Sequence, residues 1–121
     1  KFEKFVRFDL KEIPNDLWWK YFSAADLILQ AYRGGIRSGV FSEAMASKTP
    51  VVASDIPFFR EISEEYGSLK IAKNERDYSN KIKEAMKPKN YKKMVDECNR
   101  YLNENSWSIL VKKYKKIYGS L

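Results

Sequence analysis

A glycine-containing loop and the short helix expected after it carry residues whose types suit phosphate binding. Gly35 and Gly39 would let an anion approach the backbone closely, because glycine has no Cβ. Arg37 would supply a forked set of N–H donors that matches phosphate oxygens. Ser38 has the residue type of a helix N-cap, and the first helical amides, at Gly39 and Val40, would then lack intrahelical partners. Unpaired amides at a helix start attract anions, so the loop and helix start are a candidate phosphate site.

One carboxylate, Glu43, lies about one turn into the same expected helix. A carboxylate at that place could accept hydrogen bonds from vicinal hydroxyls, as an acidic residue does for the ribose in dinucleotide-binding folds. The sequence contains neither a G-x-G-x-x-G fingerprint nor a Walker sequence. Taken alone, the spacing therefore also fits an ordinary loop beside a surface glutamate that has no role.

The residue types that are missing exclude several kinds of catalytic site. The sequence has no histidine and one cysteine, Cys98, so the usual zinc and copper sites and the Ser-His and Cys-His nucleophiles are excluded. Cys98 falls on the apolar stripe of its expected helix and is predicted to be an inert packing residue. A single cysteine also suits a reducing compartment, and we expect a cytoplasmic protein.

Composition and charge describe a basic chain of the size of one domain. The 121 residues are 44% hydrophobic and 32% charged, and we interpret residues 1–121 as a single domain. No apolar run approaches the ~18 residues that a membrane span needs. The net charge of +7 would attract phosphorylated ligands, nucleic acid or anionic membrane surfaces, and does not choose among them.

Lysines recur on the last two expected helices, with tyrosines between them, at positions 87, 89, 92, 93, 112, 113, 115 and 116. The pattern favours solvated helix faces opposite apolar stripes over a nucleic-acid contact surface. A third interpretation places the basic helices on an anionic membrane, with the protein peripheral at the inner membrane face. We expect the apolar face of the final helix to cover the sheet.

The apolar pattern predicts short strands that alternate with helices. Strands are expected at residues 5–10, 26–30, 51–53 and 68–71. One helix is expected from 39 to 47, and two others after Asn15 and Asp55, each taken as an N-cap. Three helices with apolar residues at i, i+3, i+4 and i+7 end the chain. This order predicts an α/β fold with a parallel sheet flanked by helices, in which ligands bind at the carboxyl ends of the strands.

The sequence resembles the C-terminal, donor-binding domain of the retaining GT-B glycosyltransferases of family 4, or group 1, most specifically in EAMASKTPVVASD. The likeness extends both ways, from about Phe5 to Tyr118, through KEIPNDLWWKYFSAADLILQAY, GSLKI and the closing SW with its aromatic helix. It implies a Rossmann-like domain, a nucleotide-diphosphate sugar as donor substrate, retaining sugar transfer, and neither a metal nor a cofactor. The family's first strands are not matched, so we expect the distal, partial portion of this domain.

The resemblance also assigns roles to the loop and the helix. The second glutamate of the family's E-x7-E motif falls on Glu43 and binds the ribose hydroxyls of the donor. The amides around Gly39 and Val40 contact the diphosphate, and Arg37 and Ser38 assist. The donor phosphate is expected to act as the base for the acceptor hydroxyl, in agreement with the absence of histidine.

Three positions depart from the family pattern. The first glutamate of the motif, which contacts the donor sugar, would fall on Gly35, so that carboxylate is missing. Lys48 stands where the family has a helix-ending glycine, and a left-handed backbone there would cost about 1–2 kcal/mol. Phe58 also occupies a position often held by glycine.

The resemblance implies an enzyme that needs more than this chain. An N-terminal acceptor domain or a separate chain would complete the enzyme, and we expect the chain by itself to be inactive. The alternative is a non-catalytic nucleotide-binding module or subunit, which Gly35 favours. A weaker alternative is a nucleic-acid-binding domain, whose binding would depend steeply on salt and little on Glu43.

Overall fold

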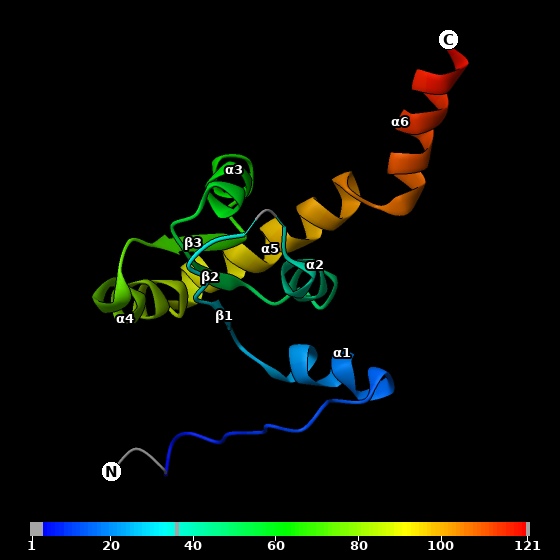
Figure 1. Cartoon of the computed structure of the whole chain (residues 1–121). Coiled ribbons are helices and arrows are strands. Elements are labelled where there is room, and N and C mark those ends of the chain that lie inside the picture. The colour runs from blue at the N-terminus through cyan, green and yellow to red at the C-terminus, as the bar shows by residue number, and fades with distance from the viewer. Residues whose placement is uncertain (1–3, 36, 121) are drawn as a thin grey trace.

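Three short parallel strands form the sheet at the centre of the molecule (Figure 1). The computed structural model describes residues 4–35 and 37–120. The strands lie in the order β1 (Ile28–Gln30), β2 (Val51–Ser54) and β3 (Leu69–Ala72). Crossover helices link them, which is the arrangement that parallel neighbours require. The predicted α/β fold with a parallel, Rossmann-like sheet is confirmed.

Helices occupy most of the remaining chain. They are α1 (Asn15–Ala24), α2 (Gly39–Ala46), α3 (Pro57–Glu65), α4 (Glu75–Ala85), α5 (Pro88–Glu104) and α6 (Trp107–Gly119). Within the part of the chain that the structure describes, no helix is long and apolar enough to cross a membrane. The helices expected from residue 39 and after Asn15 and Asp55 are all present, as are the three at the end.

The alternation of side chains along β2 divides the core into two clusters. Val51 and Ala53 pack on one side with residues of α1, α2, α3 and α5, including the fully buried Phe41 and Phe59. Val52 packs on the opposite side with residues of β3, α4 and α5. A strand buried on both faces is what a continuous apolar run predicts in a parallel sheet.

Residues 5–10 do not form the strand that their alternation predicted, because residues 6–10 carry no regular secondary structure. The side chains of Phe5, Phe8 and Leu10 are 81%, 81% and 91% exposed. A half-buried strand needs a neighbouring strand and an apolar face to pack on. Within residues 4–35 and 37–120, no strand pairs with this segment.

Two predicted N-caps are wrong, and a proline lies at the start of each helix. The cap of α1 is Pro14, whose carbonyl oxygen accepts hydrogen bonds from the amides of Leu17 and Trp18, so Asn15 is already helical. The cap of α3 is Ile56, and Pro57 takes the first helical position. Proline suits that position because its fixed φ is helical and its missing N–H has no partner to lose.

The final helix, α6, does not cover the sheet as predicted. No residue of α6 is buried among the described part of the chain, and the helix points away from the sheet beyond the end of α5 (Figure 1). The face that α6 was expected to cover is already occupied, because Met94 and Cys98 of α5 are buried against the strands. Asn105 ends α5 by donating from its amide and its side chain to the Tyr101 carbonyl.

Candidate functional site

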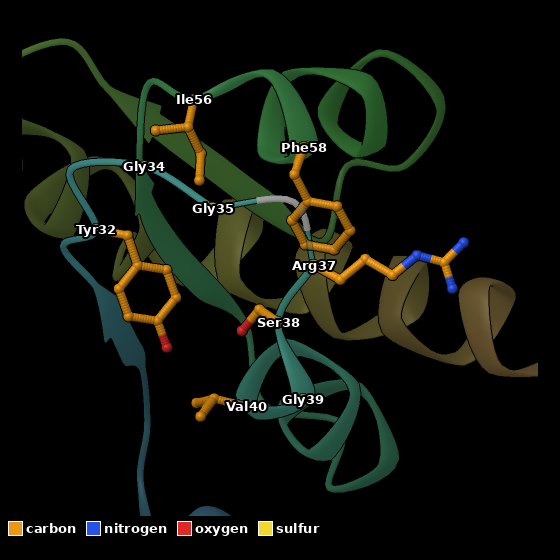
Figure 2. A pocket seen from close by; sticks show the side chains of 9 residues that line it. All are labelled: Tyr32, Gly34, Gly35, Arg37, Ser38, Gly39, Val40, Ile56 and Phe58. Carbon is orange, nitrogen blue, oxygen red and sulfur yellow. The ribbon is translucent and has the colours of Figure 1, made fainter.

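A cleft of about 260 Å³ opens at the carboxyl ends of β1 and β2 (Figure 2). The loop after β1 forms one part of its wall, and the first residues of α2 and α3 form the others. Ligands of open parallel sheets bind at this end of the strands. The residues that line the cleft are Tyr32, Gly34, Gly35, Arg37, Ser38, Gly39, Val40, Ile56 and Phe58.

Ser38 fixes the start of α2 at the edge of this cleft. Its Oγ accepts a hydrogen bond from the Phe41 amide at 3.1 Å, and its carbonyl oxygen accepts one from the Ser42 amide. This is the N-cap that the sequence predicted, and it is confirmed. Gly39 and Val40 line the cleft, and their amides, the two remaining ones of the first turn, have no intrahelical acceptor.

A buried glutamine that the sequence prediction missed holds the cap in place. Gln30, at the end of β1, is 1% exposed, and its Oε1 accepts a hydrogen bond from the Ser38 Oγ at 3.2 Å. Its backbone carbonyl accepts from the Ser54 Oγ and the Tyr78 hydroxyl. The signal for it was a polar residue that ends the apolar run LILQ just before the loop.

The glycines of the loop leave the backbone accessible. A Cβ built on Gly34, Gly35 or Gly39 would meet no atom within 4 Å, so open space lies over all three. Gly35 has a φ of +150°, a conformation that residues with side chains rarely adopt. A glutamate at position 35 would be strained in this loop conformation, which gives a physical reason for the missing carboxylate.

Aromatic side chains border the cleft on two sides. Tyr32 stacks on the buried Phe59 with ring centroids 6.1 Å apart, and Phe58 packs edge-on against Phe41 at 6.0 Å. Tyr32 and Phe58 lie on opposite sides of the cleft in Figure 2. Phe58 therefore fills part of the wall, where the family resemblance led us to expect glycine.

Arg37 and Glu43 stand at the margins of the site. Arg37 lines the cleft, but its exposed side chain extends away from the other labelled side chains in Figure 2. Glu43 is not among the lining residues. It is partly buried on α2, one turn after Gly39 and on the same side of the helix, and helical side chains lean toward the N-terminal end.

The structure thus brings together five of the six predicted site residues, and Glu43 lies beside them. Together they fit an anion site: two helix-start amides, held by the Ser38 cap, and one guanidinium. No group of three or more metal-binding side chains occurs among the described residues. Cys98 is fully buried, and burial raises the pKa of its thiol to about 12, so this side chain is packed and unreactive.

The comparison with family models agrees with this geometry. The model for glycosyl transferases group 1 matches residues 8–104. The chain belongs to this family. Membership of the group 1 glycosyltransferases indicates sugar transfer as the general activity. The three-stranded α/β arrangement fits part of such a domain. No curated protein and no solved structure matches the chain.

Proposed function

We propose that this chain holds a nucleotide-diphosphate sugar in the cleft, as the donor for retaining sugar transfer. The observation that carries the proposal is the start of α2, where Gly39 and Val40, the first two helical residues after the Ser38 cap, line the cleft. A diphosphate bound there would interact with both amides and with the positive end of the helix dipole. The open space over the three glycines leaves room for phosphate oxygens to approach.

Glu43 is proposed to accept hydrogen bonds from the ribose hydroxyls of the donor. Its position one turn beyond Gly39 would put the ribose next to the diphosphate, along the same side of α2. An exposed guanidinium at Arg37 can swing toward the leaving diphosphate and balance its charge. Ser38 acts through the cap, because its Oγ is already occupied by Phe41 and Gln30.

The proposed reaction needs no ionisable side chain of this chain as the base. The bond between the anomeric carbon and the diphosphate oxygen breaks, and the departing phosphate oxygen takes the proton of the acceptor hydroxyl. The acceptor oxygen then bonds to the anomeric carbon on the face that the diphosphate left, which retains the configuration. The chain's own part is to hold the diphosphate and the ribose while this exchange occurs.

The acceptor is proposed to come from an N-terminal acceptor domain or a separate chain, and the enzyme to work in the cytoplasm. This chain alone is therefore expected to bind the donor and to transfer no sugar. The strained φ that a glutamate would need at Gly35 favours a second candidate function, a nucleotide-binding module without turnover. Transfer by the chain together with its acceptor domain would decide for the enzyme.

The test is a calorimetric titration of the chain with UDP, GDP and ADP at low salt. Binding of at least one nucleotide is expected, and Glu43→Gln should weaken it by roughly tenfold, as loss of a charged acceptor for a hydroxyl pair implies. Glu61→Gln is the matched control, because Glu61 is an exposed carboxylate on α3, outside the cleft. Absence of binding by all three, or equal weakening by both variants, would overturn the proposal.

A further inference from the structure

The wall of the cleft that the start of α3 supplies is apolar. Ile56 and Phe58 line the cleft from there, and Figure 2 shows both side chains pointing from α3 toward the loop that contains Gly34 and Gly35. Ile56 is 7% exposed, and Phe58 is partly buried. A ligand held at the start of α2 therefore meets carbon atoms on the α3 side of the cleft.

Neighbouring rings hold Phe58 in place. Its ring lies edge-on to the ring of Phe41, with centroids 6.0 Å apart, and is tilted against the ring of Phe59 at 5.2 Å. Both neighbours are fully buried, so Phe58 packs on a close-packed support. The apolar wall is therefore formed before a ligand arrives, as is usual for sites that bind small molecules.

This wall offers no side-chain acceptor for a hydroxyl group. Among the described residues that line the cleft, none is a carboxylate or a carboxamide. Asp55, next to Ile56 in the chain, accepts a hydrogen bond from Arg60 Nε at 2.5 Å and does not line the cleft. The Tyr32 hydroxyl lies on the α2 side of the cleft in Figure 2. A sugar hydroxyl placed against Ile56 and Phe58 would thus lose its water without gaining a side-chain partner.

Open space for a substituent lies over the loop that this wall faces. A Cβ placed on Gly34 or Gly35 would meet no atom within 4 Å, and both glycines line the same cleft of about 260 Å³. A diphosphate bound beside Gly39 and Val40 would leave the α3 side of the cleft to the group that it carries. In the proposed function that group is the sugar of the donor.

We propose, on the basis of the donor function given above, that the cleft selects a sugar that carries a methyl group, with Phe58 as the specificity-determining residue. The methyl group packs on Phe58 and Ile56, where it leaves water for an apolar surface. A hydroxyl in the same place has no side chain to bond, so it is disfavoured. Two kinds of sugar supply such a methyl group, namely N-acetylated amino sugars and 6-deoxy sugars.

The experiment is a calorimetric titration with four ligands that share one nucleotide: UDP, UDP-glucose, UDP-N-acetylglucosamine and UDP-6-deoxyglucose. If GDP or ADP binds more tightly than UDP in the titration above, the same four ligands are made on that nucleotide. At least one methyl-bearing ligand is expected to bind roughly tenfold more tightly than the glucose ligand, since one extra carbon in an apolar pocket contributes about that factor. The ligand that shows the gain distinguishes the acetyl methyl from the 6-deoxy methyl.

Three variants at position 58 test whether this side chain carries the preference, measured as the ratio of the affinities for the methyl-bearing ligand and the glucose ligand. Phe58→Ala should reduce the ratio to about twofold or less, because the wall recedes from the methyl group. Phe58→Leu is the matched control and should keep most of the ratio, since its side chain is still apolar and bulky. Phe58→Gln should shift the preference toward glucose, because its side-chain oxygen accepts from a hydroxyl. Far-UV circular dichroism checks that each variant is folded.

The possible failures separate this proposal from the donor function. Equal affinity for the three sugar ligands, or tightest binding of the glucose ligand, would overturn the methyl preference and leave the donor function intact, because the nucleotide would still bind. A preference that Phe58→Ala and Phe58→Gln both leave unchanged would overturn the role of Phe58. If UDP, GDP and ADP all failed to bind, the donor function and the methyl preference would both be overturned.

Discussion

The capping hydroxyl of Ser38 is predicted to contribute more to the free energy of unfolding than the side chain of an ordinary N-cap does. Its Oγ serves two buried groups, because it accepts from the Phe41 amide at 3.1 Å and donates to Gln30 Oε1 at 3.2 Å. Ser38 is 8% exposed and Gln30 is 1% exposed, so water cannot readily replace the hydroxyl. Ser38→Ala would leave both groups without their partner and would release the helix start at the cleft.

The size of the effect follows from the two lost contacts. Removal of an N-cap side chain costs about 1 kcal/mol, and an orphaned buried acceptor costs at least about 1 kcal/mol more. We therefore expect Ser38→Ala to lower the free energy of unfolding by about 2 kcal/mol. Because Gln30 Nε2 already lacks a partner among the described residues, Gln30→Met in the Ser38→Ala background should recover about 1 kcal/mol of that loss.

The assay is urea unfolding followed by far-UV circular dichroism, with midpoints compared at a common m-value. Ser42→Ala is the matched control, since Ser42 is an exposed serine of the same helix, and its effect should stay within about 0.5 kcal/mol. If Ser38→Ala cost no more than Ser42→Ala, the two-sided role of the hydroxyl would be refuted. If the effects of Ser38→Ala and Gln30→Met on the free energy of unfolding simply added in the double variant, the proposed coupling of Ser38 and Gln30 would be refuted.

Three further predictions concern the scaffold. Lys48 has a φ of 56°, so Lys48→Gly should raise the free energy of unfolding by about 1 kcal/mol in urea, while Lys48→Ala should not. The pKa of Glu97 is lowered, mainly by the hydrogen bond from Arg100, so the ionised carboxylate stabilises the folded chain. This contribution to the free energy of unfolding is complete above the unfolded pKa of about 4.3 and is lost as the pH falls through the lower folded pKa. Stability measured between about pH 6 and pH 3 should accordingly fall less steeply for Glu97→Gln than for the parent, and a parallel fall would contradict this reasoning. Since burial raises the pKa of Cys98 to about 12, iodoacetamide at neutral pH should label the thiol in urea and spare it in the folded chain.

Local rules predicted the cap of α2 but not those of α1 and α3, and two expectations failed because they depended on a neighbouring element. Ser38 was predicted as an N-cap because its own side chain satisfies the helix start, and the structure confirms it. The apolar periodicity predicted the α6 helix, but periodicity gives a face and not its partner. Residues 5–10 failed for the same reason, since alternation makes a strand only where another strand is available.

The loop and helix start of the candidate site were predictable from the sequence, and the aromatic and apolar side chains that complete the cleft were not. Glycine and serine at positions 35, 38 and 39 indicated a loop leading into a helix start, which is what lines the cleft. Tyr32, Ile56 and Phe58 come to it from the loop after β1 and from the start of α3, a convergence that only the sheet topology creates. The prediction also missed Gln30, because its hydrogen-bond partner Ser38 lies eight residues further along the chain, beyond the loop.

The position of Gln30 bears on how readily the cleft can change its ligand in evolution. Its backbone carbonyl accepts hydrogen bonds from the Ser54 and Tyr78 hydroxyls at 3.3 and 3.4 Å, and its side-chain oxygen accepts one from the Ser38 Oγ. One residue therefore connects β1 to β2, α4 and α2. Replacement of Gln30 would remove the side-chain bond to Ser38 at the start of α2, while the two bonds to the backbone carbonyl would remain. Leu29 next to it is 54% exposed, and its side chain makes no such bond. We therefore expect changes of ligand to arise from substitutions in the loop, and not from substitution of Gln30, which holds the end of the loop in place.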